Sequence, residues 1–201
     1  MAQTATDFPT LAQTLWRPEA QNRVLRGIVL ALLGTALLTA SAKVQIPFYP
    51  VPMTLQTLVV LGLGMAYGWR LAAATLLLYL AQGAAGLPVF AGTPEKGLGL
   101  AYMLGGTGGY LLGFVMAAAA CGWLAERGWD RSVVTTALAM LLGNLLIYVP
   151  GLLWLGALFG WDKPILAWGL LPFLLGDLVK LALAALLLPL AWKALGRAPR
   201  R

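Results

Sequence analysis

Long apolar segments recur along the chain from residue 24 to near its end, and short polar, proline-containing or glycine-containing segments separate them. A helix of about 20 apolar residues is long enough to cross the hydrocarbon core of a bilayer. The separators, such as "GWR", "ERGWDR" and "GWDKP", carry residues that form turns or end helices. The pattern predicts six membrane-spanning helices, over residues 24–42, 53–68, 70–86, 103–125, 132–158 and 165–192.

The composition agrees with this pattern, because 60% of the 201 residues are hydrophobic and only 10% are charged. A soluble domain usually has about a quarter of its residues charged. We therefore expect an all-α membrane protein with one six-helix transmembrane domain over residues 24–195. Residues 196–201 are expected to form a basic cytoplasmic tail, and residues 1–23 a retained cytoplasmic leader.

The leader has a helical pattern of its own. Phe8, Leu11, Leu15 and Trp16 fall on one side of a helix, as in helices that lie in the membrane interface. Two prolines in the same segment limit such a helix. The segment is therefore expected to form either a short interfacial helix or a disordered leader.

The basic residues predict the orientation in the membrane, because cytoplasmic loops hold an excess of lysine and arginine. With the N-terminus inside and six spans, most of the 14 basic residues fall in the cytoplasm. These are Arg17, Arg23, Arg26, Arg70, Arg127, Arg131, Lys193, Arg197, Arg200 and Arg201. Lys43, Lys96 and Lys163 fall outside, and Lys180 lies within the last span. Both termini are therefore expected in the cytoplasm, and the charge pattern needs no nucleic-acid partner.

The last predicted span carries Asp177 and Lys180 in "GDLVKLALA". Each ionisable group costs about 2.5 to 3.5 kcal/mol at the centre of a membrane helix. Residues three apart share a helix face and can neutralise each other. Intramembrane charges usually face a ligand path, so we expect a binding site here; a purely structural ion pair is the alternative.

Neutral polar residues on other spans are candidates to join this pair around one small polar ligand. Gln56, Gln82, Asn144 and Tyr148 are of this kind, although any one of them alone could hydrogen-bond a neighbouring helix.

Small residues recur four apart in two predicted spans, a spacing that allows helices to approach closely. Gly105, Gly109 and Gly113 form one such strip, and Ala36 and Ala40 form another in the first span. The alanine pair either packs inside the bundle or docks another membrane protein.

Several site classes are excluded by the sequence. Histidine is absent and Cys121 is the only cysteine, so histidine-based catalysis, a Cys/His metal site and an internal disulfide are ruled out, and Cys121 is expected to be a small packing residue. "GTPEKGL" has Leu98 where a phosphate-binding loop needs lysine. We expect no catalytic residue, no metal, no cofactor and no ATP site in this chain.

Five motifs together resemble the BioY family, the biotin-specific S components of energy-coupling factor (ECF) transporters. They are "IPFYPVPMTLQTLVVLGLG", "LLYLAQGAAGLPVFAG", "GGTGGYLLGF", "IYVPGLLWL" and "GDLVKLALA", and the similarity runs from about residue 31 to residue 193. The resemblance implies a six-helix S-component fold in a bacterial cell membrane. It also implies that the protein captures biotin from outside and works with a transmembrane coupling protein and two ATP-binding-cassette ATPases. Self-association stays open.

The resemblance also implies a set of site residues. The Asp177–Lys180 pair matches the family's biotin-binding element, with Gln56, Asn144 and Tyr148 as further head-group candidates. Phe90, Tyr102 and Trp154 are expected to line the apolar walls. The stretch after "GLPVFA" departs from the family pattern, so Lys96 is only a weak candidate for the biotin carboxylate and is otherwise solvated. The alanine pair at positions 36 and 40 is expected to dock the coupling protein.

Two other functions are weighed against this one. The first is an S component for another vitamin, such as thiamine or riboflavin. The second is a small intramembrane enzyme that uses Asp177 as acid or base, but no second acidic residue, histidine or Ser–Lys pairing supports that chemistry.

Overall fold

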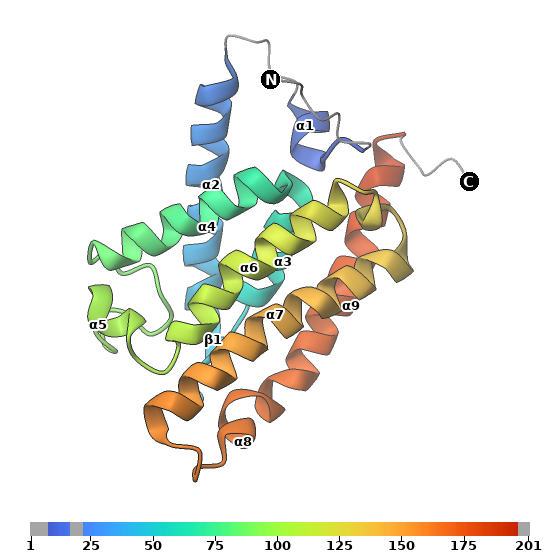
Figure 1. The fold of residues 1–201 in the computed structure, drawn as a ribbon. Coiled ribbons are helices and arrows are strands. Elements are labelled where there is room, and N and C mark those ends of the chain that lie inside the picture. Colours follow the sequence, from blue (N-terminus) through green and yellow to red (C-terminus); the bar gives the residue numbers. More distant parts are fainter. Residues whose placement is uncertain (1–7, 17–21, 197–201) are drawn as a thin grey trace.

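The computed structural model describes residues 8–16 and 22–196, which form a bundle of long helices (Figure 1). In chain order the elements are α1 (Leu11–Leu15), α2 (Arg23–Lys43), β1 (Gln45–Ile46), β2 (Met53–Thr54), α3 (Gln56–Tyr67), α4 (Trp69–Ala84), α5 (Gly99–Met103), α6 (Gly108–Ala125), the 3-10 helix η2 (Trp129–Arg131), α7 (Val133–Phe159), α8 (Ile165–Gly169) and α9 (Leu171–Ala194). The two short strands pair antiparallel. The predicted helical bundle is confirmed.

The helices differ in how fully they could span a membrane. Within the described residues, four segments are long and apolar enough: α2, α6, α7 and the combined stretch Ile165–Ala194. Helices α3 and α4 have 12 and 16 residues, which makes them about 18 and 24 Å long. The second and third spans are therefore shorter than a full crossing.

Three predicted boundaries are wrong. Residues 53–54 belong to the β-hairpin rather than to a helix, because the three prolines of "IPFYPVP" favour extended backbone before the helix. Residues 104–107 interrupt the fourth span between α5 and α6, where Gly105 and Gly106 disfavour helix. The sixth span is broken at Leu170, whose backbone (φ −134°, ψ −60°) separates α8 from α9.

Glycines bring α6 close to its neighbours. A Cβ added at Gly109 would lie 2.3 Å from the carbonyl oxygen of Pro150, and one at Gly113 would lie 2.7 Å from the Cα of Ile147, both on α7. At Gly122 it would lie 2.4 Å from the backbone nitrogen of Trp69, at the start of α4. Two members of the predicted small-residue strip, Gly109 and Gly113, therefore pack α6 against α7, whereas the third, Gly105, lies before α6.

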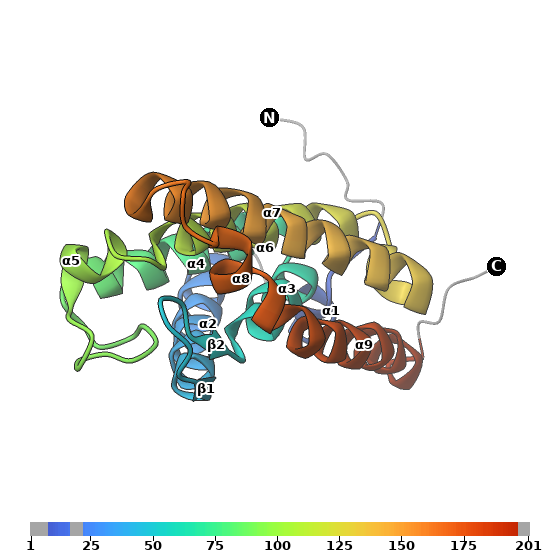
Figure 2. The same cartoon turned by 90° about the horizontal axis from the view of Figure 1, so that it is seen from below.

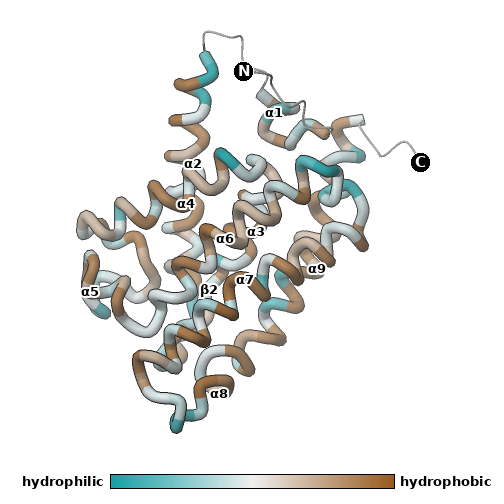
Figure 3. Tube along the Cα trace, in the orientation of Figure 1, coloured by the Kyte–Doolittle hydropathy of each residue, from teal (hydrophilic) through white to brown (hydrophobic). Residues whose placement is uncertain are grey.

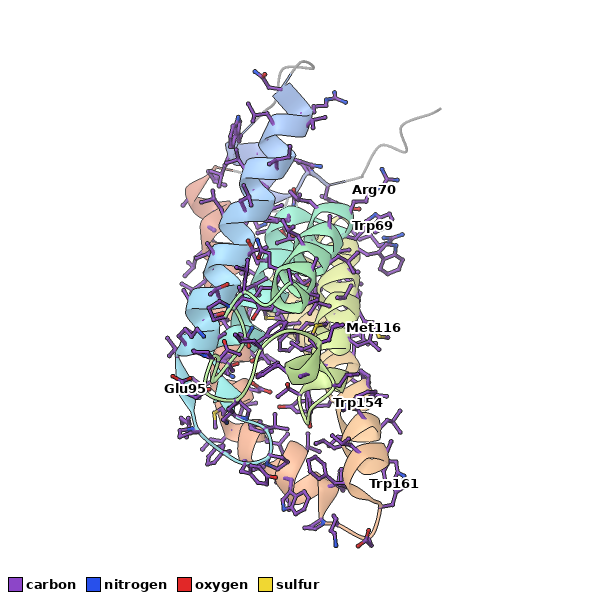
Figure 4. All side chains as sticks on the ribbon, turned by 90° about the vertical axis from the view of Figure 1, so that its left-hand side faces the viewer. Trp69, Arg70, Glu95, Met116, Trp154 and Trp161 are labelled. Carbon is purple, nitrogen blue, oxygen red and sulfur yellow. The ribbon has the colours of Figure 1, made fainter. Side chains whose placement is uncertain are left out.

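Side chains on the outside of the bundle agree with a bilayer environment. Hydrophobic colours follow the long helices, and the hydrophilic ones lie mostly near helix ends (Figure 3). Trp69 and Arg70 project at the end that holds the termini, and Trp161 projects at the opposite end (Figure 4). The Arg70 guanidinium lies 5.1 Å from the centre of the Trp69 ring. Tryptophan and basic residues at helix ends are typical anchors in the membrane interface.

The N-terminal segment contains a short helix. Thr10 and Gln13 form a capping box at the start of α1, with hydrogen bonds from Thr10 N to Gln13 Oε1 (3.0 Å) and from Gln13 N to Thr10 Oγ1 (3.4 Å). Leu11 and Ala12 are buried and Leu15 is exposed. The rest of the predicted leader falls largely on residues 1–7 and 17–21, and all but one residue of the predicted tail on 197–201; both lie outside the described residues.

The N-terminal segment is tied to α9 through η2. The Arg131 guanidinium lies between the rings of Phe8 (4.7 Å) and Trp192 (4.4 Å) and donates to Pro9 O (3.2 Å). The Trp192 indole donates to Asp130 Oδ2 at 2.6 Å. Burial raises the pKa of the Asp130 carboxyl to about 6, although the Trp192 bond and the Arg131 charge oppose the shift. This cluster closes the end of the bundle that carries the termini.

The opposite end is built from connecting segments. The β1–β2 hairpin, the loop between α4 and α5 (residues 85–98, the α4–α5 loop) and helix α8 gather there (Figures 1 and 2). The hairpin and the α4–α5 loop line the cavity described next.

Candidate substrate-binding site

A cavity opens near the end of the bundle opposite the termini. It has about 570 Å³ of space between atoms, including the part that opens to solvent, and its lining is mainly apolar. The lining comes from residues 51–57, the α4–α5 loop, α5, α6, α7 and α9. A volume of 300 to 1,000 Å³ is usual for a small-molecule site. Asp177 and Lys180 are the charged residues among the lining side chains.

The Asp177 carboxylate is buried and receives three hydrogen bonds. Lys180 Nζ donates to Oδ1 at 2.9 Å, Thr57 Oγ1 donates to the same oxygen at 3.0 Å, and the Tyr148 hydroxyl donates to Oδ2. Asp177 is only 6% exposed. Because a carboxylate has about four acceptor positions, one remains for a ligand.

All three N–H donors of the Lys180 ammonium bond neighbouring groups of the protein. It donates to the Thr54 carbonyl oxygen (2.7 Å), to Thr57 Oγ1 (2.9 Å) and to Asp177. The pair therefore joins α9 to the β2–α3 junction and, through Tyr148, to α7. The pair therefore offers a strong charged acceptor on Asp177 at the edge of an apolar cavity, while the three donors of Lys180 are used within the protein.

A second polar group lies deeper on α3. Gln56 is buried and lines the cavity. Its Nε2 donates to the Tyr79 hydroxyl at 2.8 Å, and that hydroxyl donates to the Val89 carbonyl oxygen, also at 2.8 Å. The side-chain amide is thereby fixed by α4 and the α4–α5 loop.

Aromatic rings form the walls. Phe90 stacks on Tyr102 with ring centres 4.9 Å apart and meets Tyr79 edge-on at 5.3 Å. Tyr110 donates to the Gly169 carbonyl oxygen at 2.7 Å and so supports the break between α8 and α9. Phe173 adds a ring from α9. Such walls suit a flat, mostly apolar ligand body.

The structure brings together six of the nine sequence-predicted binding residues around this cavity. These are Gln56, Phe90, Tyr102, Tyr148, Asp177 and Lys180.

The other three do not line the cavity. Asn144 lies beside two other pockets that also touch Asp177, and its Oδ1 is buried without a hydrogen-bond partner among the described residues. Trp154 donates from Nε1 to the Gly105 carbonyl oxygen at 2.8 Å, and so fastens the α5–α6 connection. Lys96 is exposed on the α4–α5 loop. Gln82, the further polar candidate, donates to Thr35 on α2 at 3.4 Å.

Some residues of the site were missed by sequence reasoning. Thr57 bonds both members of the ion pair, yet it reads as an ordinary helix residue next to Gln56. Tyr79 and Tyr110 had a weak signal, because a tyrosine in an apolar helix needs a partner for its hydroxyl. Within residues 8–16 and 22–196, no three His, Cys, Asp or Glu side chains group as metal ligands would.

Comparisons with known proteins agree on one family. A family model described as "BioY family" matches residues 11–197. The "Probable biotin transporter BioY" of Pyrococcus horikoshii is 37% identical over 80% of this chain and 92% of its own length. The "Biotin transporter BioY" of Thermotoga maritima is 38% identical over 81% of this chain and 94% of its own.

A solved structure has the same fold. The crystal structure of the S-component for biotin from an ECF-type ABC transporter superposes with a TM-score of 0.73 at 23% identity. The match covers 88% of this chain and 95% of that one. The prediction of an S-component type of bundle is confirmed.

Removing the ammonium of the buried pair should destabilise the bundle. In Lys180→Met the Asp177 carboxylate keeps only neutral partners, which we expect to cost about 3 kcal/mol, as for other half-broken buried pairs. Asp177→Asn combined with Lys180→Met should recover most of this loss. Thermal unfolding in detergent measures the effect.

The matched control is Lys163→Met. Lys163 pairs with Asp162 at 2.8 Å on an exposed loop, and such a pair contributes about 0 to 1 kcal/mol. If Lys180→Met unfolded at the same temperature as the parent protein, the buried pair would have no stabilising role.

Proposed function

The chain belongs to the BioY family, and on that premise we propose that it is the biotin-binding S component of an ECF-type importer. It captures biotin from outside and delivers it inward together with an ATPase module. It is a transporter component and not an enzyme, and biotin is its cargo rather than a cofactor. The observation that carries this proposal is the Asp177–Lys180 pair at the edge of an apolar, aromatic-walled cavity.

The chemistry of biotin fits the cavity. Its ureido ring has two N–H donors and one carbonyl acceptor. An N–H complements the free acceptor position of Asp177, and the carbonyl accepts from Lys180 when biotin displaces one of the three acceptors that the ammonium now bonds. Charge-assisted hydrogen bonds of this kind contribute about 1.5 to 3 kcal/mol each. Gln56 and Tyr148 stand beside the pair as further partners of the head group. Phe90 and Tyr102 offer aromatic rings to the apolar part of biotin's fused ring system.

The biotin carboxylate needs a partner elsewhere. Among the residues that line the cavity no cation other than Lys180 is present. Lys96 stays a candidate only if the α4–α5 loop moves, since its side chain is exposed. Neither Asn144 nor Trp154 lines the cavity. Their role in biotin binding stays a prediction, and any effect on the ligand would pass through other residues.

The two rival functions have less support. The relatives are named biotin transporters, which does not favour another vitamin. An intramembrane enzyme would need Asp177 free to exchange protons, yet its oxygens accept bonds from Lys180, Thr57 and Tyr148.

The first membrane helix offers a face for a partner. Ala36 and Ala40 are exposed, whereas Leu38 and Ala42 on the same helix are buried. This supports docking over packing inside the bundle. We infer that the transmembrane coupling protein binds this face and that the ATPases act through it.

The two ends of the bundle support a definite orientation in the bacterial cell membrane. Arg23, Arg26, Arg70, Arg127 and Arg131 belong to the segments at the end of the termini. That end therefore faces the cytoplasm, and the cavity opens to the outside.

Asp177→Asn should weaken biotin binding at least tenfold, because it replaces a charged acceptor by a neutral group of the same shape. Equilibrium binding of labelled biotin to the purified protein in detergent measures it. Asp162→Asn, which neutralises an exposed aspartate, is the control and should bind as the parent does. Restored binding in Asp177→Asn with Lys180→Met would mean that the pair is purely structural.

Cysteine labelling should reveal the orientation. Glu95 and Arg127 are exposed at opposite ends, and Cys121 is fully buried, so the native thiol adds little background. A cysteine at Glu95 should react with an impermeant thiol reagent in intact cells, and one at Arg127 only after permeabilisation. Gly92 is less suitable, because its φ of +68° strains any other residue. Labelling of position 127 in intact cells would reverse the orientation.

Tryptophan on the small-residue face should separate docking from binding. Ala36→Trp or Ala40→Trp should abolish co-purification with the ATPase module and stimulated uptake, since the bulky ring holds a partner helix away. Biotin affinity should stay within about threefold, or about 0.65 kcal/mol. Ala74→Trp, an exposed alanine on α4, is the matched control and should keep both activities. Lost biotin binding with intact co-purification would assign this face to the protein's own core.

A further inference from the structure

The α4–α5 loop forms one wall of the cavity. Phe90 and Ala91 line it, and Phe90 is held between Tyr102 and Tyr79. A Cβ at Gly83 would lie 2.0 Å from the Phe90 ring, so the ring fits against bare backbone of α4. Any outward movement of this loop therefore opens the wall of the cavity.

Lys43, the last residue of α2, fastens this loop. Its Nζ donates to the carbonyl oxygen of Phe90 (3.0 Å), to the carbonyl oxygen of Thr93 (2.9 Å) and to Thr93 Oγ1 (3.0 Å). An ammonium has three donors, and here all three go to one loop that lies 47 and 50 residues further along the chain.

The loop is shaped to receive this cation. The Thr93 hydroxyl also donates to the Phe90 carbonyl oxygen at 2.7 Å, and Thr93 is buried. The backbone thus directs the carbonyl oxygens of Phe90 and Thr93 at the same donor. A donor with several hydrogens, such as an ammonium, can bond both of them at once. A basic residue at a helix C-terminus often bonds the carbonyls of its own helix, yet Lys43 makes three hydrogen bonds to the loop.

We propose that Lys43 is a positioning residue that holds the α4–α5 loop closed over the cavity and thereby sets how long the substrate is retained. The inference rests on the proposed function for the identity of the substrate. Lys43 acts through Phe90 and Thr93 and does not itself touch the ligand. The fastening raises the barrier to loop opening, so its loss speeds release and does not slow capture.

The test compares three variants of the full chain in detergent. Lys43→Met keeps the apolar stem and removes the donors, Lys43→Arg keeps charge and donors, and Glu95→Gln removes a charge from an exposed position of the same loop. Dissociation of labelled biotin should be at least fivefold faster in Lys43→Met, with association unchanged or faster. Lys43→Arg and Glu95→Gln should stay within twofold of the parent.

Two further readouts separate fastening from other roles. The uncharged methyl ester of biotin should show the same acceleration in Lys43→Met, because the effect passes through the loop. Amide hydrogen exchange should increase in residues 85–98 and stay unchanged in α6.

Four results would each overturn the proposal. They are dissociation from Lys43→Met within twofold of the parent, an equal effect of Glu95→Gln, an effect confined to the charged ligand, and faster exchange throughout the bundle. If the parent protein bound no biotin, the proposed function would fail, and hydrogen exchange of the loop would still decide the role of Lys43.

Discussion

An aspartate and a lysine held 2.9 Å apart in a largely apolar bundle constrain where the surrounding helices can lie. Neither charge is tolerable there alone, so each needs its full set of partners. Thr57 from α3 and Tyr148 from α7 supply these partners together with the Thr54 carbonyl. The same bonds that stabilise the charges therefore fix α3, α7 and α9 around one point. A ligand that bonds the pair is recognised by groups that the fold has already oriented.

The aromatic wall depends on a second chain of contacts that starts beside this pair. Gln56 follows the Thr54–Leu55 turn directly, and its amide leads through Tyr79 to the backbone of the α4–α5 loop. Phe90 then closes the wall from that loop. The polar and apolar parts of the cavity are thus linked through α4, although each comes from a different part of the chain. The close contacts of α6 with α7 keep the opposite wall in place.

The sequence predicted best what depends on local spacing. Asp177 and Lys180 lie three apart on one helix, so their pairing needed no knowledge of other elements. Thr57 could not be assigned, because its role depends on how α3 is rotated against α9. Asn144 lies one helical turn before Tyr148 on α7 and shares a neighbouring pocket with it, yet only Tyr148 also lines the cavity. That small angular difference between neighbouring turns is set by packing.

The element boundaries failed for a related reason. Hydropathy averages over many residues, so the short breaks at residues 104–107 and at Leu170 were absorbed into apolar runs. Both breaks lie next to the cavity, where Trp154 and Tyr110 satisfy backbone carbonyls at Gly105 and Gly169. A contact between distant segments stabilises each break, and only the first break has a local signal, the glycines at 105 and 106. The family resemblance, and not hydropathy, indicated three wall residues; Phe90 and Tyr102 line the cavity, and Trp154 does not.

The unequal helix lengths have a consequence for the surrounding lipid. Helices α4 and α9 lie on opposite sides of the bundle (Figures 1 and 2), and they contain 16 and 24 residues. Their lengths therefore differ by about 12 Å, and both expose leucines, Leu77 on α4 and Leu175 on α9 among them. A bilayer of uniform thickness cannot match both sides at once. It must thin beside α4, or the whole protein must tilt, at a modest cost per ångström of mismatch. The apolar surface of the protein is thus taller on the α9 side than on the α4 side. The tilt of the protein in the bilayer therefore depends on the thickness of the membrane.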